Sequence, residues 1–232
     1  MTKQEFYKLV KGSLFIIISI FTFLAESTSV TAQEIKKDST ETPFRKGRWL
    51  TGLAGSISSG TTENTSLGNK SSSNQYGINI STGKFIKDRV LVGFLFNIQR
   101  LNFEGDAFKK NTEILSIGLG ASYYFSKSKI GSLFFNLSPV FVVYRDETSL
   151  KLEDEFTELL SKGEGIGILS TLGYSYVLHD RISFDLGLST NVNWLNVEEN
   201  RVPEESINNV NFVLSDLSFT FGFNVLLDEF FF

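Results

Sequence analysis

Apolar and polar residues alternate strictly over much of the chain after residue 48. The segment 182–194 is the clearest case, and its apolar face carries Ile182, Phe184, Leu186, Leu188, Val192 and Trp194. Its other face carries Ser183, Asp185, Gly187, Ser189, Asn191 and Asn193. Successive side chains of a strand point to opposite faces, so this period of two predicts a β-strand with two unlike faces. A helix would place Asp185 and Leu188 on the same face, so a helix does not fit the pattern.

The same alternation recurs in seven more segments. It predicts strands near 48–58, 73–84, 90–103, 112–125, 132–146, 163–178 and 211–227. The connections between them alternate in length, with short ones at 85–89, 126–131 and 179–181 and longer ones at 59–72, 104–111, 147–162 and 197–210. Short periplasmic turns and longer external loops are typical of outer-membrane barrels. The pattern therefore predicts an all-β, eight-stranded antiparallel up-and-down transmembrane barrel over 48–232, with its first strand running outward.

The sizes of the residues on the two faces decide which face meets lipid. A soluble ligand-binding barrel would keep its bulky apolar side chains inside. Eight strands enclose an interior that side chains just fill, and Gly, Ser, Asn and Thr fit that space better than rings from every strand. We therefore expect bulky residues such as Phe94, Leu186 and Phe221 to face hydrocarbon. Unpaired backbone groups find no water in a bilayer, so the sheet is expected to close.

The N-terminus has the three parts of a secretory signal peptide. Lys3, Lys8 and Lys11 form a positive region, an apolar run follows at 14–24, and Ala32 ends a stretch of small residues. The alternative is a transmembrane anchor, but a spanning helix needs ~20 apolar residues. We expect a cleavable signal peptide over 1–32, which implies export by the general secretory route, and a flexible periplasmic leader over 33–47.

Composition excludes several kinds of chemistry. The chain of 232 residues has no Cys and one His, so it offers neither a thiolate metal site nor a multi-His zinc site. Its net charge of −4 argues against a nucleic-acid binder. We therefore predict no cofactor and no nucleic-acid partner.

The pattern and the last strand together resemble a known family. The segment 219–227 reads FTFGFNVLL and the last residue is Phe232. In these respects residues 48–232 resemble the small outer-membrane β-barrel proteins of Gram-negative bacteria, the OmpA/OmpX-like barrels. The resemblance implies a place in the cell outer membrane, contact with its lipid and lipopolysaccharide, and a final strand read by the barrel-insertion machinery. Asp228 and Glu229 depart from the family pattern, because they interrupt the alternation before the final Phe residues.

Few residues are candidates for chemistry. Register places the carboxylates of Asp185 and Asp216 in the lumen, where they could act as acid and base or line an ion path with Asn97 and Asn193. They lie at different heights, so a catalytic pair is disfavoured, and pairing with hydroxyls, amides, water or Arg48 is the simpler interpretation. His179 stands in a short turn, without the Ser and acid that a hydrolase needs beside it.

The long loop 147–162 is the other candidate region. Phe156, Leu159 and Leu160 have helix-like spacing, which fits a short amphipathic turn at the membrane rim or a partner contact. A solvated loop is the simpler alternative. Function in β scaffolds tends to lie on loops, so we expect a non-enzymatic structural or surface-interaction protein that can bind an extracellular ligand. The alternatives are a narrow pore for small solutes and a lipid-modifying enzyme.

Overall fold

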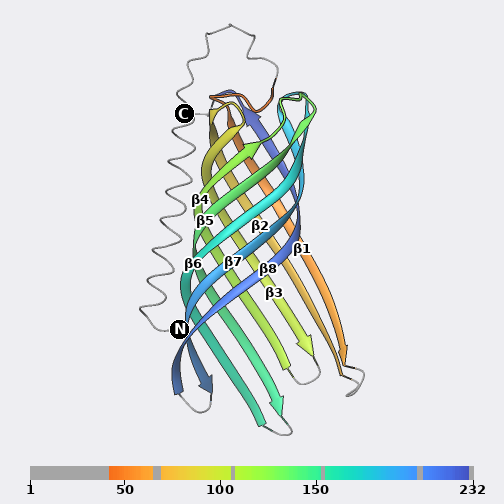
Figure 1. Cartoon of the computed structure of the whole chain (residues 1–232). Coiled ribbons are helices and arrows are strands. Elements are labelled where there is room, and N and C mark those ends of the chain that lie inside the picture. The colour runs from red at the N-terminus through yellow and green to blue at the C-terminus, as the bar shows by residue number, and fades with distance from the viewer. Residues whose placement is uncertain (1–41, 65–68, 106–107, 153–154, 203–205, 230–232) are drawn as a thin grey trace. The chain divides into compact units, whose positions relative to one another are not determined.

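Eight antiparallel strands form one closed barrel in a computed structural model of the chain (Figure 1). The structure describes residues 42–64, 69–105, 108–152, 155–202 and 206–229. The strands are β1 (Trp49–Asn64), β2 (Asn69–Lys87), β3 (Val90–Gly105), β4 (Phe108–Tyr124), β5 (Gly131–Leu152), β6 (Glu155–Leu178), β7 (Ile182–Val202) and β8 (Ser206–Leu227). Each strand pairs with the next in sequence, and β1 pairs with β8. The all-β, up-and-down barrel is confirmed. In the described part of the chain, no helix is long and apolar enough to cross a membrane.

The strands are staggered around the barrel. A path that starts at Ile57 on β1 and moves to the register partner on each next strand, through β2 to β7, reaches Asn209 on β8. The direct partner of Ile57 on β8 is Phe219, ten residues further along that strand. This offset is the shear of the barrel, and it requires the strong strand tilt seen in Figure 1. An eight-stranded barrel is narrow, so its inward side chains decide whether anything can pass.

Bulky apolar residues face outward, as predicted. Phe94 is 66% exposed, Leu186 57% and Phe221 52%. On β5 this apolar band runs from Leu133 to Val143 and on β6 from Ile166 to Tyr176. A tilted strand needs about 9–11 residues to cross a bilayer, so the band has the height of a membrane. The molecule is therefore built as a transmembrane barrel.

The long connections are much shorter than the sequence predicts. The predicted loop 147–162 is almost entirely strand, because β5 continues to Leu152 and β6 begins at Glu155. The loops 59–72, 104–111 and 197–210 are likewise mostly strand. Their polar residues lack an apolar face, which is the signal that marks a strand in sequence, yet neighbouring strands pair them. We call the outer parts of β5–β8, beyond the apolar band, the outer wall (144–152, 155–165, 195–202 and 206–212).

The lumen is less polar than predicted. Two groups of inward apolar residues lie within it. The inner plug, near the short turns, consists of Phe44, Leu50, Phe85, Leu91, Tyr124, Phe134, Val177 and Leu226. The outer plug, toward the long hairpins, consists of Leu95, Ile114, Val140, Val142, Tyr144, Leu169, Leu195 and Val197. Segment 132–146 has apolar residues on both faces, and its inward ones are Phe134 in the inner plug and Val140, Val142 and Tyr144 in the outer plug.

Candidate functional site: a polar chamber inside the barrel

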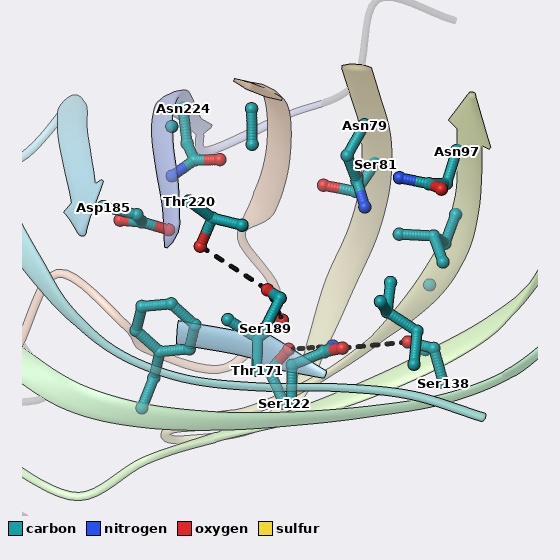
Figure 2. Close-up of a pocket in the computed structure, with 18 of the residues that line it drawn as sticks. Asn79, Ser81, Asn97, Ser122, Ser138, Thr171, Asp185, Ser189, Thr220 and Asn224 are labelled. Atoms are coloured by element: carbon teal, nitrogen blue, oxygen red, sulfur yellow. Dashed lines mark hydrogen bonds between the residues drawn. The ribbon is translucent and has the colours of Figure 1, made fainter. Parts of the chain in front are cut away.

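A cavity of about 120 Å³ lies between the two plugs. Leu50, Leu91, Tyr124 and Phe134 of the inner plug form part of its lining, and so do Leu95 and Leu169 of the outer plug. Small polar side chains line the remainder, and Figure 2 shows many of them directed into one space from strands all around the barrel: Asn79, Ser81, Asn97, Ser122, Ser138, Thr171, Asp185, Ser189, Thr220 and Asn224. We call this cavity the chamber. One water needs roughly 10–15 Å³ by this measure, so the chamber has room for several.

Hydroxyl and amide groups link neighbouring strands across the chamber wall. The hydroxyls of Thr171 and Ser189 are 2.7 Å apart, and Ser189 reaches Thr220 at 3.5 Å. On the neighbouring strands, Asn136, the register partner of Thr171, donates its Nδ2 to Ser122 Oγ at 2.9 Å (Figure 2). The Ser, Thr and Asn side chains in these bonds are uncharged and can both donate and accept hydrogen bonds. This part of the lining therefore suits neutral polar groups.

Several buried polar atoms have no partner in the described part of the chain. Ser56 Oγ and Asn97 Oδ1 belong to residues of the chamber lining, and Asn97 is only 5% exposed. Asn193 is fully buried, and neither its Oδ1 nor its Nδ2 has a partner among the described residues. An unpaired buried polar atom costs about 1–3 kcal/mol, so the atoms of Ser56 and Asn97 favour occupation of the chamber by water or a polar ligand, while Asn193 lies outside its lining.

The inner plug depends on residues that precede the first strand. Phe44 is fully buried, its ring stacks on Tyr124 with centroids 4.0 Å apart, and Arg89 N donates to its carbonyl at 2.7 Å. The predicted flexible leader 33–47 is therefore wrong for its last residues, since 42–47 pack into the mouth of the barrel. Residues 33–41 and the predicted signal peptide 1–32 lie outside the described residues. The sequence gives no sign that Phe44 is buried, because its neighbours are polar and form no periodic pattern with it.

Four charged residues hold this end of the barrel together. Arg48 is 2% exposed, and its guanidinium contacts Asp180 Oδ1 at 3.1 Å and Asp228 Oδ1 at 2.9 Å. Arg45 contacts the same two carboxylates at 2.9 and 2.8 Å. A hydrogen bond to Asp180 raises the pKa of Arg45, whereas burial lowers the pKa of Arg48. We call these four residues the terminal clamp, because they join the residues before β1 and after β8 to the β6–β7 turn.

The outer plug is covered by a buried carboxylate. Asp146 on β5 is 2% exposed and accepts hydrogen bonds from Thr112 at 2.5 Å and Thr148 at 3.1 Å. Lys110 Nζ lies 3.4 Å from Oδ2, the oxygen that also accepts from Thr148. The carboxylate is thus fully satisfied by its neighbours, and it belongs to the architecture of the outer end.

The four predicted lumen residues all face inward, but they do not meet. Asp185 and Asn97 line the chamber, and Ser183 Oγ donates to Asp185 at 3.4 Å. Asp216 lies nearer the long hairpins, where Gln75 Nε2 donates to its carboxylate at 3.0 Å. Because Asp216 pairs in register with Asn191, it stands six residues from Asp185 along β7, roughly 20 Å. The two carboxylates cannot act on one substrate atom, and Arg48 pairs with neither of them.

The predicted amphipathic turn does not form. Phe156, Leu159 and Leu160 belong to β6 and pair with β5, where Leu160 faces Glu147 in register. Leu159 and Leu160 are half-buried, so the conformation expected for these residues is corrected while their proposed contact role remains a proposal. His179 lies in the β6–β7 turn with a φ of 50°. Across the described ranges, no three His, Asp or Glu side chains are grouped so as to hold a metal ion.

Sequence reasoning missed two glutamines whose side chains reach across the lumen. Gln75 and Gln99 face inward on β2 and β3, and Gln99 Oε1 accepts a hydrogen bond from Asn191 at 3.2 Å. The alternation does assign both to the inner face. That they reach across the lumen follows only from the stagger of the strands.

Comparison with known proteins gives a family and several similar solved structures. OprG from Pseudomonas aeruginosa is 14% identical, with a TM-score of 0.49, covering 80% of this chain and 99% of that chain. Neisserial surface protein A is 22% identical, with a TM-score of 0.44, covering 78% and 97%. A major outer membrane protein from Thermus thermophilus is 9% identical, with a TM-score of 0.49, covering 78% and 99%. Among curated protein sequences, none matches the chain. Residues 39–229 match one family over most of the barrel, and the chain therefore belongs to the family described as "Protein of unknown function, DUF481".

Proposed function

We propose that this chain is a non-enzymatic surface-interaction protein of the outer membrane, in which a closed barrel anchors the outer wall. The outer wall carries the proposal, because β5 continues nine residues beyond Val143, where its apolar band ends. Many of its outward residues are charged or amide-bearing, including exposed Arg145, Lys162 and Asn196. Paired strands hold these side chains in fixed positions, as a binding surface requires.

The two plugs support an anchor rather than an open pore. Phe44 and Val142 are both fully buried, one in each plug, so packed apolar layers lie above and below the chamber. Ions do not cross such layers without large desolvation costs. The chamber itself is the observation that favours the second candidate, a narrow conduit, which would require both plugs to move.

The side chains of the chamber support a non-enzymatic role. Its Ser and Thr hydroxyls bond to one another and to amides, whereas a nucleophilic Ser needs an adjacent base. The chain has a single His, and it lies in the β6–β7 turn rather than in the chamber lining.

The same reasoning extends to the partners of the barrel. We propose that the apolar band contacts outer-membrane lipid and that the outward residues just beyond it contact lipopolysaccharide. The outward aromatic residues Phe219, Phe221 and Phe223 would present β8 to the barrel-insertion machinery after export. The half-buried Leu159 and Leu160 would add apolar contacts for an extracellular ligand.

Two measurements test the proposed function. Planar bilayers containing the purified chain are expected to show no channel events, and stable unitary conductance would favour the conduit. A photo-crosslinking residue at Asn196 or Lys162 is expected to give discrete adducts of higher mass in intact cells. The same residue at lipid-facing Leu188 is the control. If neither wall position gives an adduct absent from the Leu188 control, the surface-interaction role is wrong.

A further inference from the structure

The ladder between β1 and β8 is incomplete at membrane depth. Among the described residues, the pairing of these strands ends at Ile57 and Phe219, although β1 continues to Asn64 and β8 begins at Ser206. Figure 1 shows the two strands diverging toward the long hairpins. Val213 and Leu217, on the β8 side of this gap, are 58% and 65% exposed, so they belong to the apolar band. We call this gap the seam.

An open strand edge beside hydrocarbon has a cost that the barrel must offset. Backbone N–H and C=O groups that face lipid without partners each cost several kcal/mol, so irregular backbone at this depth lies beside water or protein. The chamber is a polar space beside this gap, because Ser56 and Ser218, next to the last β1–β8 pairs, are part of its lining. The chamber and the outer leaflet therefore meet at the seam.

One hydrogen bond crosses the inner side of the seam. Gln75 pairs in register with Ser58, the first β1 residue beyond the ladder. Its amide reaches past β1 to Asp216 on β8, at 3.0 Å. This contact joins β2 to β8 at the point where β1 and β8 separate, so it closes the mouth of the chamber without a backbone ladder.

Packed side chains close both ends of the chamber, and the seam is the longest break in its wall among the described residues. Phe44 and the terminal clamp close the short-turn end, and the outer plug with Asp146 closes the other. The remaining walls are paired strands, and the break in the β4–β5 ladder at Pro139 spans only two residues on each strand. Opening the seam requires the loss of the side-chain bonds that Gln75 and Gln99 make to Asp216, and a displacement of β1.

We propose that the chamber takes up the polar head of a single-chain amphiphile from the outer leaflet through the seam. The apolar chain would stay in the bilayer beside Val213 and Leu217. Hydroxyl and amide groups of the lining, together with the unpaired Asn97 oxygen, suit a head rich in hydroxyl groups. The Asp185 and Asp216 carboxylates disfavour an anionic head. This site is independent of the outer wall, so either proposal can fail alone.

The absence of native Cys allows a direct test in phospholipid vesicles. The probe is dodecyl methanethiosulfonate, which partitions into the bilayer, and its target is Thr171→Cys on the chamber wall, two strands from the seam. A Ser58→Cys/Ser218→Cys disulfide extends the existing register by one pair and locks the seam. Locking is expected to slow labelling of Thr171→Cys at least about tenfold, and reduction should restore it. Leu172→Cys, which faces lipid, is the control whose labelling the lock leaves unchanged.

A second variant tests the seam without a disulfide. Gln75→Ala is expected to speed labelling of Thr171→Cys severalfold, whereas Thr82→Ala, which removes the Thr51–Thr82 contact in the fully paired part of β1, is not. Dodecyl maltoside should protect Thr171→Cys, and dodecyl sulfate at equal bilayer concentration should not. Equal rates with and without the lock, or faster labelling by a water-soluble charged thiosulfonate, would overturn the proposal. Equal protection by both amphiphiles would overturn the head-group assignment.

Discussion

The two ends of the barrel close in different ways. At the short-turn end, β1 pairs with β8 from Trp49 to Ile57, and Arg48 bridges Asp180 and Asp228 beneath the ladder. At the other end, the first and last strands are not paired beyond Ile57 among the described residues, and side-chain bonds to Asp216 replace the ladder. The contacts that close the barrel therefore differ along its height. They are stronger at the short-turn end, where the first and last strands are paired. The weaker end is the one that can open without unfolding the rest.

Removal of the buried ring at the stronger end is expected to have the largest effect. Phe44→Ala deletes a fully buried side chain that stacks on Tyr124, and such a change lowers the free energy of unfolding by about 3–5 kcal/mol. Urea unfolding in lipid vesicles measures it. Phe44→Leu should recover much of the loss, because it refills most of the space. A loss below about 1 kcal/mol for Phe44→Ala would mean that 42–47 do not pack into the mouth.

A pair of Arg substitutions on β7 separates the membrane band from the outer wall. Leu188→Arg introduces a charge into the apolar band, where Leu188 is 55% exposed, and should cost about 2–4 kcal/mol. Asn200→Arg changes an exposed outward residue of the wall and should stay within about 0.5 kcal/mol of the native chain. Equal costs in the same unfolding assay would mean that the wall lies inside the bilayer.

The terminal clamp predicts unequal roles for its two Arg residues. Arg48→Ala leaves buried acceptors, including the carbonyl of Pro43, without their donor and should cost about 1.5–3 kcal/mol. Arg45→Ala removes an exposed ion pair and should cost less than about 1 kcal/mol. A double-mutant cycle of each with Asp228→Ala measures the coupling. Similar coupling energies for Arg45 and Arg48 would show that the burial of Arg48 does not strengthen its interaction with Asp228.

The smallest effect is expected in the lumen. Asn193→Leu replaces a buried amide that has no partner among the described residues by an apolar group of similar volume. Exchange of an unsatisfied polar group for an apolar one is nearly neutral or stabilising, so the change should stay within about 1 kcal/mol of zero. Asn136→Leu, which removes the bond to Ser122, is the matched control and should cost more. A large loss for Asn193→Leu would show that water or a ligand satisfies its amide.

Alternation predicted the strands and the direction of their faces well. Phe94, Leu186 and Phe221 face outward as expected, because a period of two assigns each residue to a face without knowledge of its neighbours. Most of the outer wall was predicted as loop, because alternation identifies a strand only where one face is apolar. Residues such as Lys162 and Glu198 lie in segments without an apolar face, and only pairing with neighbouring strands makes these segments β-strands.

The candidate site was predictable only in part. Asp185 and Asn97 were correctly assigned to the lumen, yet nothing in the sequence separates them from Asp216, which lies on the same face about 20 Å away. Phe44 was placed in a flexible leader, because a single aromatic residue among polar ones carries no periodic signal.

The sequence by itself determined that this chain forms a barrel of eight strands with its bulky residues in lipid, because strand periodicity and side-chain size are local properties. Only the tertiary structure decided where the lumen is blocked, which polar atoms remain unpaired and where the first and last strands separate. These features depend on the stagger of ten residues around the ring, which brings together side chains such as Gln75 and Asp216 that lie far apart in the chain.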